Sequence, residues 1–357
     1  MKKLVVIAAV LLVIWGQVAF NQAQSPTEST IGAGKQPDVC VDTKGQIKIV
    51  FGQADNLYYV TSADNGKSFT QPVKIATLPK LASASSRGAK IAVTPNYTVI
   101  AAATFAGNIY ALRMPHKTGK WSAPAKINDV DTVAKEGFVG LAAGKEDRVY
   151  TVWLDLRNDR KNKIYGAASE NGGQSWTANK LLYRSPDKSV CECCRPTIVA
   201  DVKGNVHVMF RNWLNGSRDM YLLSSADNGR NFKKVQKLGI GTWPLNACPM
   251  DGGDLAVDAN GKINTVWRRD KEIFTALPGL PEKKLSEGRT PVLIETVQGP
   301  AVAWQQNGEI LLQRSGSLSV QNIGKGAYPA LAALPGGKSA VCAWERDGQV
   351  LVKVVPL

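Results

Sequence analysis

One short pattern occurs three times along the chain and limits the folds that the chain can adopt. The segments NLYYVTSADNGKSF (56–69), KIYGAASENGGQSW (163–176) and DMYLLSSADNGRNF (219–232) each run from an alternating strand into a turn, Ser-x-Asp/Asn-x-Gly-x-x-Phe/Trp. The Asp or Asn can accept backbone N–H groups in the turn, and the glycine permits the positive φ that a chain reversal needs. The last aromatic can return to the core between sheets. The pattern therefore predicts the same strand–turn–strand unit at three places.

A longer repeat surrounds these turns. A degenerate copy, NIYALRMPHKTGKW (108–121), lies between the first and second turns, and each copy starts with a strand such as QPDVCVD (36–42) or RPTIVAD (195–201). Seven copies of the first three strands can be counted, and a fourth strand follows in six of them. Four-stranded units repeating every ~37 to 56 residues predict an all-β fold, a β-propeller.

The number of blades and the closure of the ring follow from the ends of the repeat array. The chain ends after the third strand of the last copy, so we expect residues 26–34 to supply its missing outer strand. The last two repeats are short, which leaves six blades as an alternative to seven. A β-helix is the weaker alternative because its repeats are shorter.

The first 24 residues have the features of a secretory signal. Lys2 and Lys3 precede an apolar run from Leu4 to Trp15, and a polar stretch of small residues follows, with a cleavage site expected near Ala23. An uncleaved N-terminal anchor is the alternative, and no later stretch is apolar for long enough to span a bilayer. We predict a signal peptide at 1–24, one propeller domain at 25–357, a secreted or periplasmic location, and a monomer.

The net charge of +15 favours acidic partners. Candidates are an acidic glycan or another anionic ligand, whereas a basic surface with no particular partner is the alternative. Nucleic acid is disfavoured because the chain has no long Lys/Arg run and is expected to be exported.

The repeated turn is the Asp-box (BNR) motif, and the chain resembles the sialidase superfamily of Asp-box propellers. The resemblance implies that Asp64, Asn171 and Asp227 are structural and lie on the face away from the active site. Loops on the opposite face would then carry the site. Clustered arginines suit carboxylates, and tryptophan suits stacking on sugar rings. The substrate-binding candidates in these loops are Arg157, Arg195, Arg211, Arg218, Arg268, Asp155, Trp213 and Trp243.

The resemblance also implies a catalytic set. Sialidases bind the substrate carboxylate with three arginines and attack with a tyrosine that a glutamate activates. Tyr328 lies where the tyrosine is expected, and Glu192 or Asp251 would be its acid or base partner. The family's Arg-Ile-Pro is replaced by GKQPDV (34–39), and LPKLASASSRGAK (78–90), which should carry the acid, contains no Asp or Glu. A rim or core role for Tyr328, and a binding propeller without catalysis, are therefore the alternatives to an exo-sialidase type of glycoside hydrolase.

Four of the six cysteines are expected to be neighbours. Cys191, Cys193 and Cys194 precede the fourth inner strand, and Cys248 precedes the fifth. Export favours a disulfide from Cys248 to one member of the cluster. Two disulfides, one of them between Cys193 and Cys194, are an alternative.

A metal site is the other alternative for this cluster. The four thiolates could bind Cu(I) or Zn(II), with Met250 as an extra ligand, although no cofactor is favoured. Thioredoxin-like redox chemistry is the least expected, because no C-x-x-C opens a helix. Cys40 and Cys342 lie in the first and last blades and could form a ring-closing disulfide or remain separate buried thiols.

Overall fold

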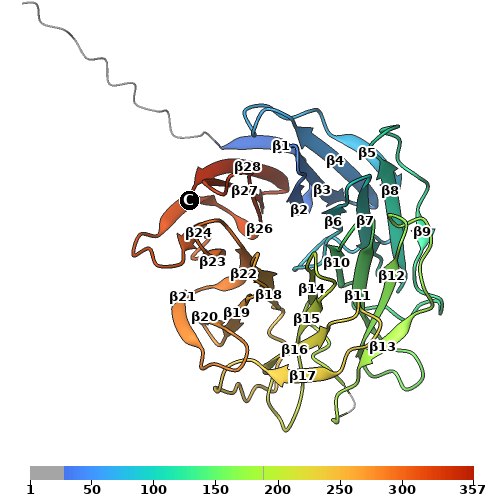
Figure 1. Cartoon of the computed structure of the whole chain (residues 1–357), viewed down its shortest axis with the longest axis vertical. Coiled ribbons are helices and arrows are strands. Elements are labelled where there is room, and N and C mark those ends of the chain that lie inside the picture. The colour runs from blue at the N-terminus through green and yellow to red at the C-terminus, as the bar shows by residue number, and fades with distance from the viewer. Residues whose placement is uncertain (1–27, 188) are drawn as a thin grey trace, which may run out of the picture.

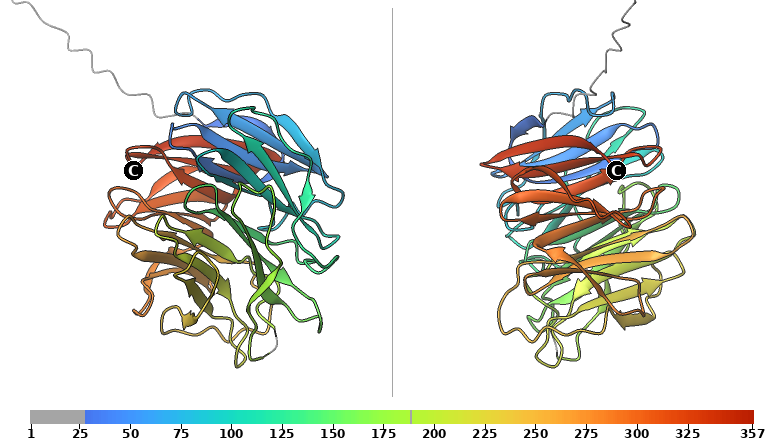
Figure 2. Two further views of the ribbon diagram at one scale, coloured as in Figure 1. Left: turned by 45° about the vertical axis from the view of Figure 1, so that its right-hand side comes forward. Right: turned by 90° about the vertical axis from the view of Figure 1, so that its left-hand side faces the viewer.

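The computed structural model describes residues 28–187 and 189–357, so the signal segment expected at 1–24 lies outside the described residues. The regular elements in this part of the chain are twenty-eight β-strands, which form seven four-stranded antiparallel sheets. Figure 1 shows these sheets as the blades of a ring, and Figure 2 gives two side views of it. The prediction of an all-β propeller is confirmed, with seven blades rather than six. Within the described residues no helix has the length and apolar character to cross a membrane.

The first three blades, from inner to outer strand, contain the following elements. Blade 1 has β2 (Lys35–Val41), β3 (Ile47–Gln53), β4 (Asn56–Ser62) and β5 (Val73–Thr77). Blade 2 has β6 (Lys90–Val93), β7 (Tyr97–Ala103), β8 (Ile109–Pro115) and β9 (Ala125–Lys126). Blade 3 has β10 (Val139–Ala143), β11 (Val149–Asp155), β12 (Lys163–Ser169) and β13 (Lys180–Tyr183).

The other four blades continue the same order. Blade 4 has β14 (Thr197–Ala200), β15 (Val206–Arg211), β16 (Met220–Ser225) and β17 (Lys234–Lys237). Blade 5 has β18 (Gly253–Val257), β19 (Ile263–Arg269), β20 (Glu272–Ala276) and β21 (Lys283–Glu287). Blade 6 has β22 (Arg289–Ile294), β23 (Ala301–Gln306), β24 (Glu309–Arg314) and β25 (Gln321–Lys325). Blade 7 has β26 (Ala327–Ala333), β27 (Ser339–Arg346), β28 (Gln349–Pro356) and, as its outer strand, β1 (Ser29–Ala33).

The N-terminal strand closes the ring. β1 pairs antiparallel with β28, with Ser29 opposite Val352 and Ala33 opposite Gln349. The expectation that residues 26–34 complete the last blade is therefore confirmed. The inner strands β2 and β26 of the first and last blades also lie in contact.

The cores lie between neighbouring blades. The second strands carry bulky apolar side chains, and Trp153, Trp304 and Trp344 are fully buried. Each apolar cluster joins strands of adjacent blades; Trp344 of β27, for example, packs with Ala301 and Leu312 of blade 6. Burying apolar surface contributes about 25 cal/mol per Å² to stability, so these contacts between blades stabilise the ring.

The three repeated turns have the expected local structure. In the first, Asp64 Oδ1 accepts the Ser68 N–H (3.0 Å), and Ser62 Oγ accepts the Gly66 N–H (2.9 Å). Gly66 has a φ of +81°, and Phe69 packs against the core between blades 7 and 1. Asn171 accepts the Ser175 N–H in the same way (3.0 Å). All three turns connect third and fourth strands, as the resemblance implied.

Candidate functional site

A polar cavity lies where the seven inner strands surround the axis. It has a volume of about 180 Å³. Its rim consists of residues that lie just before inner strands or in their first two positions, and its wall carries polar side chains farther along those strands. The rim residues are Gln36, Ser86, Arg195, Asp251, Thr290 and Tyr328, and the wall includes Asp38, Lys90, Thr197 and Asp254. We call this the channel cavity.

Four of the six rim residues have positive φ: Ser86 (+67°) and three that share a second feature. Gln36, Thr290 and Tyr328 have φ values of +53°, +50° and +55°, and each is followed by proline. At each of them the pairing between inner and second strand shifts register, as at a β-bulge. A bulge re-aims a side chain, and a non-glycine residue with positive φ costs about 1–2 kcal/mol. Such strain is concentrated at functional sites, which supports a role for this rim.

Close packing of neighbouring blades brings the rim together. A Cβ on Gly88 would lie 2.8 Å from Gln36 O, and one on Gly252 would lie 2.6 Å from Arg195 O. Only glycine therefore fits where one blade's loop passes the backbone of another at the axis.

Arg195 is the cation of the rim. It is half-buried, and within the described residues it makes no hydrogen bond and no ion pair; its Nε is buried without a partner. Thr290 Oγ1, on the same rim, is also buried and unpartnered. A buried polar group without a partner costs about 1–3 kcal/mol, so both atoms are suited to a ligand. Burial raises the pKa of the wall residue Asp254, although the charge of Arg195 acts in the opposite direction.

Asp251 lies on the rim, and one oxygen of its carboxylate is engaged by the protein. Its Oδ2 accepts hydrogen bonds from Arg268 Nη1 (3.2 Å) and from the Thr290 backbone N–H (3.1 Å), and its side chain is buried. It therefore fixes the loop of blade 5 against blade 6 and is not a free acid.

Tyr328 lies on the rim of the channel cavity, near Arg87. Arg87 donates from Nε to the Glu136 backbone oxygen (2.6 Å) and lies over the Phe138 ring at 4.2 Å. Within the described residues no hydrogen bond joins the Tyr328 hydroxyl to a carboxylate. Glu192, its expected partner, instead forms an ion pair with Arg218 (3.4 Å) and does not line the channel cavity.

The pair Asp155 and Arg157 lies outside the cavity and forms a closed network. Asp155 is fully buried and accepts from Trp153 Nε1 (2.9 Å) and from Arg157 Nη2 (2.8 Å). The Arg157 guanidinium also binds Asp129 (2.9 Å) and lies 4.1 Å from the Tyr165 ring centroid. The guanidinium donors of Arg157 are therefore bound to residues of blade 3 and of the loop that leads into it.

The other sequence candidates form a second cluster, between the loops of blades 4 and 5. Arg211 is 1% exposed and donates to the backbone oxygens of Arg218 (2.8 Å) and Arg268 (2.7 Å). The Trp243 ring centroid lies 5.1 Å from the guanidinium carbon of Arg211 and 5.7 Å from that of Arg268. Arg218 stacks on Trp213 at 4.3 Å. The structure thus brings these arginines and tryptophans together, with the guanidinium donors directed at the protein itself.

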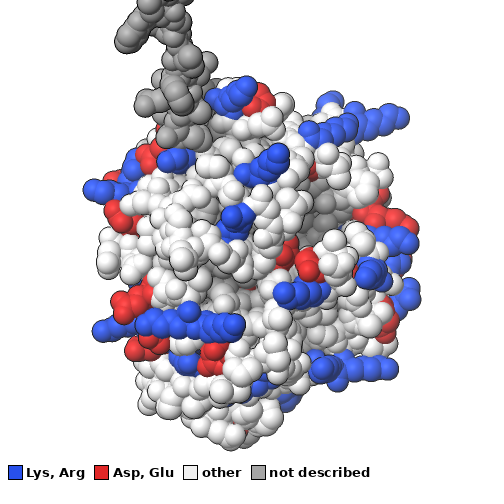
Figure 3. Space-filling model, turned by 60° about the vertical axis from the view of Figure 1, so that its left-hand side comes forward, with Lys and Arg blue, Asp and Glu red and all other residues white. Residues whose placement is uncertain are grey.

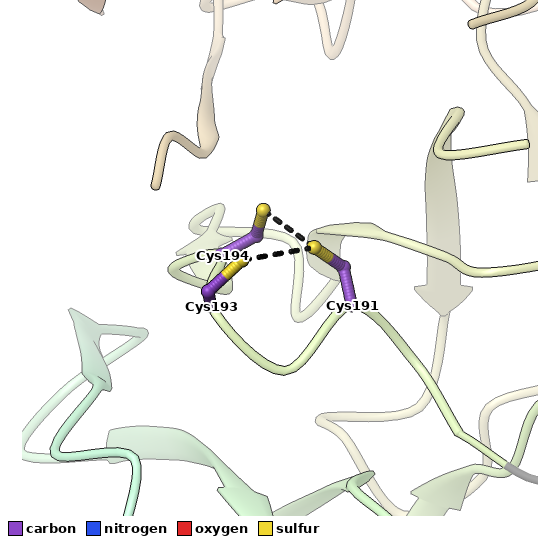
Figure 4. A group of neighbouring side chains, drawn as sticks. All are labelled: Cys191, Cys193 and Cys194. Atoms are coloured by element: carbon purple, nitrogen blue, oxygen red, sulfur yellow. Dashed lines mark hydrogen bonds between the residues drawn. The ribbon is translucent and has the colours of Figure 1, made fainter. Parts of the chain in front are cut away.

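The cysteines lie at the border of this second cluster. A disulfide joins Cys193 to Cys248, which confirms the expected bridge, whereas Cys194 is free, so the alternative of a Cys193–Cys194 bridge is wrong. The sulfur atoms of Cys191, Cys193 and Cys194 all lie within 4.8 Å of one another (Figure 4). Because Cys193 is part of the disulfide, the thiols of this group that could bind a soft metal ion in this state are those of Cys191 and Cys194.

The two strand cysteines do not close the ring. Both are free, and they lie in different cores: Cys342 between blades 6 and 7, and Cys40 against the core of blades 1 and 2. The ring-closing disulfide is therefore not formed. Burial raises the pKa of Cys342 to about 12.

Sequence reasoning missed several residues around the cavity. Gln36 and Thr290 could have been found from a shared pattern, because GKQP (34–37), GRTP (288–291) and GAYP (326–329) stand at the start of three inner strands. Glu136 and Arg87 each stand directly before the glycine that precedes an inner strand. Burial raises the pKa of Glu136.

Surface charge does not mark a further site on the face that Figure 3 shows. Lys and Arg side chains are spread over it, with Asp and Glu side chains among them. The net positive charge is therefore not gathered into one patch on this face.

No protein-family model matches the sequence, and no curated protein matches it. Solved structures do match. A PL25 ulvan lyase bound to -[GlcA(1-4)Rha3S]- has a TM-score of 0.56 at 10% identity, over 92% of this chain and 94% of that chain. An α-L-arabinanase from Penicillium chrysogenum, complexed with arabinobiose, has a TM-score of 0.54 at 12% identity, over 92% and 98%. The K499G mutant of NanB sialidase from Streptococcus pneumoniae also matches, at 13% identity over 93% of this chain and 69% of that chain, with a lower TM-score of 0.45. At these identities the likeness is one of fold.

Proposed function

We propose that the protein is an exported propeller that binds an acidic sugar in the channel cavity, with Arg195 as the carboxylate-binding group. The observation that carries the proposal is the pair of buried, unpartnered polar atoms on one rim, Arg195 Nε and Thr290 Oγ1. A carboxylate accepts charge-assisted hydrogen bonds from a guanidinium, preferably two in parallel. A sugar hydroxyl can then pair with the threonine.

The remaining rim supports the same class of ligand. Tyr328 offers an aromatic ring, and Gln36 and Ser86 offer polar groups to sugar hydroxyls. The structural neighbours crystallised with arabinobiose and with -[GlcA(1-4)Rha3S]- bind saccharides on the same fold, which supports the proposal by analogy alone. Export rests on the lysines and apolar run of residues 1–24.

Binding is favoured over hydrolysis by the environment of the carboxylates. Asp251 is committed to Arg268 and Thr290, and Glu192 to Arg218, so neither is placed to activate Tyr328. Hydrolysis is the second candidate, because Tyr328, Asp251 and Arg195 line one cavity. Turnover of fluorogenic sialosides or uronides that is lost in Tyr328→Phe would establish it.

Calorimetric titration with N-acetylneuraminic acid and glucuronic acid tests the binding proposal, with neutral glucose as the matched ligand control. Losing a hydrogen bond to a charged group costs about 1.5–3 kcal/mol, so Arg195→Gln should bind the acidic sugars about 10- to 100-fold more weakly. Arg289→Gln is the matched protein control, since Arg289 is exposed and outside the channel cavity. Binding that is unchanged in Arg195→Gln, or absent for every acidic sugar, would contradict the proposal.

A further inference from the structure

The cysteines at the border of blades 4 and 5 have a feature that sugar binding does not use. Cys191 and Cys194 have C-x-x-C spacing, and their sulfur atoms are 2.7 Å apart. Cys191 Sγ also lies 3.8 Å from Cys193 Sγ, which is bonded to Cys248. Figure 4 shows Cys191 facing both of the other sulfur atoms. One thiol is thus in reach of a second thiol and of a disulfide.

Two buried arginines surround Cys191. Arg218 Nη1 lies 3.0 Å from Cys191 Sγ and 3.4 Å from Glu192 Oε2. Arg211 is directed at backbone oxygens and, within the described residues, has no carboxylate ion-pair partner. A buried cation needs a compensating anion, and removing the anion leaves a penalty of several kcal/mol. Glu192 pairs with only one of the two arginines, so a thiolate at Cys191 would supply a second negative charge beside them.

The ionisation of the two free thiols agrees with this balance. Burial opposes ionisation at Cys191, but its hydrogen bond with Cys194 and the charges of Arg211 and Arg218 hold its pKa below the ordinary value. Burial and the neighbouring Cys191 raise the pKa of Cys194 well above it. The thiolate is the nucleophile in thiol–disulfide exchange. A lowered pKa of the first cysteine is common in C-x-x-C pairs.

We propose that these four cysteines form a thiol–disulfide exchange site, in which the Cys191–Cys194 dithiol and the Cys193–Cys248 disulfide exchange their bond. Cys191 thiolate attacks Cys193 Sγ, the Cys191–Cys193 bond forms, the Cys193–Cys248 bond breaks, and Cys248 leaves as a thiolate. Cys194 then attacks Cys191 Sγ; Cys193 leaves and takes the proton that Cys194 loses. Before and after the exchange the four cysteines contain one disulfide, one thiol and one thiolate. No external oxidant is therefore needed.

The exchange moves reactivity to the surface. Cys191, Cys193 and Cys194 are buried, whereas Cys248 is exposed. The negative charge that starts on Cys191 ends on Cys248, where it can meet a disulfide in solution. The co-substrate is therefore a disulfide compound that reacts at Cys248, and oxidised glutathione is the probe.

Bridge mapping of the full exported chain tests the exchange. The protein is held at neutral pH, quenched with acid, alkylated, digested and analysed by mass spectrometry. We expect both the Cys193–Cys248 and the Cys191–Cys194 bridges, and accumulation of a Cys191–Cys193 bridge with free Cys248 in Cys194→Ser. Cys342→Ser is the matched control, because Cys342 is buried in a distant core, and it should leave the map unchanged. Detection of the Cys193–Cys248 bridge alone in wild type and in Cys194→Ser overturns the proposal, as does stoichiometric copper or zinc on these thiols in the native mass.

A second measurement does not depend on the folding of a cysteine variant. The rate at which Cys248 becomes reactive toward oxidised glutathione should fall at least tenfold in Arg218→Gln and recover in part in Arg218→Lys, because the lysine keeps the charge beside Cys191. Arg289→Gln should react like wild type. Equal rates in wild type and Arg218→Gln, with circular dichroism showing both folded, would overturn the role of the thiolate.

Discussion

The channel cavity and the cluster between blades 4 and 5 both contain arginine, but they use it in opposite ways. Among the described residues Arg195 has no partner for its buried Nε, whereas Arg211 donates to backbone oxygens and lies beside Trp243. An arginine whose donors are all engaged stabilises the protein, and one with a free donor is available to a ligand. The difference shows that a cluster of arginines on one face does not itself define a binding site.

The largest expected effect is a difference in the free energy of unfolding between variants of these two arginines. Arg211→Met removes the donor to buried oxygens, each of which costs about 1–3 kcal/mol when unsatisfied, so the free energy of unfolding should fall by about 3 kcal/mol or more. Arg195→Met should lower it by less than about 1 kcal/mol, because within the described residues the guanidinium makes no hydrogen bond or ion pair and methionine keeps the apolar stem. Urea denaturation measures both. Similar losses in the two variants would remove the distinction.

A second prediction concerns the glycine that brings the two regions together. In Gly252→Ala the new Cβ would lie 2.6 Å from Arg195 O, so the backbone at the rim must move. Such overpacking costs about 1–3 kcal/mol, and acidic-sugar binding should weaken with it. Gly216→Ala is the comparison for binding: its Cβ position has open space and it lies outside the channel cavity, so its φ of +73° should lower stability through backbone strain but leave acidic-sugar binding unchanged. Urea denaturation and calorimetry distinguish the two, and a Gly252→Ala variant with wild-type stability would contradict the packing argument.

A third prediction uses pH to contrast Glu136, in the loop before the inner strand of blade 3, with the repeated turns. Burial raises the pKa of Glu136 above its ordinary value of 4.5, so the folded state binds more protons than the unfolded state in the window above pH 4.5. Stability therefore falls as pH rises through that window. Glu136→Gln should remove this fall, as measured by urea denaturation between pH 4 and pH 8.

Asp227 should behave in the opposite way. Hydrogen bonds from Ser225 and Asn231 hold its pKa below the ordinary value of 3.8, so its contribution is present above pH 3.8 and is lost as pH falls below it. Asp227→Asn should make the acid side of the stability profile flatter and leave the neutral side's slope unchanged. The same slope for both variants across the whole range would refute the contrast.

The smallest effect is expected in the turn of blade 3. Asn171 takes the place that Asp64 and Asp227 occupy in the other turns, and Asn171→Asp keeps the acceptor for the Ser175 N–H. The melting temperature should change little, corresponding to less than about 0.5 kcal/mol. A large change, measured by calorimetry, would show that the three turns are not equivalent.

The fold could be predicted because its determinants are local and repeated. The turn at Asp64 is built from residues within seven positions of one another, and the same pattern recurs at Asn171 and Asp227. The closing strand could be predicted because the last repeat lacked a partner for β28. The one-bridge expectation for Cys248 also followed from the order of the blades.

The site could be predicted only in outline, because its details depend on contacts between distant loops. Whether Arg211 is satisfied depends on backbone oxygens of Arg218, Asp251 and Arg268, contributed by two blades. Sequence spacing placed Asp155 near the axis, but its side chain is held by Trp153 and Arg157. The strained positions of Gln36, Thr290 and Tyr328 arise from register shifts that a strand pattern does not reveal.

The pairing of β1 with β28 has a consequence for how the ring assembles. Ser29 and Val352 are partners across nearly the whole described chain, so the first strand to be synthesised is without its neighbour until the last blade exists. Contacts between such distant residues are slow to form, because closing a long loop costs entropy before the contact compensates for it. Blades 1 to 6 can each pair their strands in sequence order, and the pairing of β1 with β28 is a separate, late event. Deleting β1 should therefore leave six complete blades with an open ring.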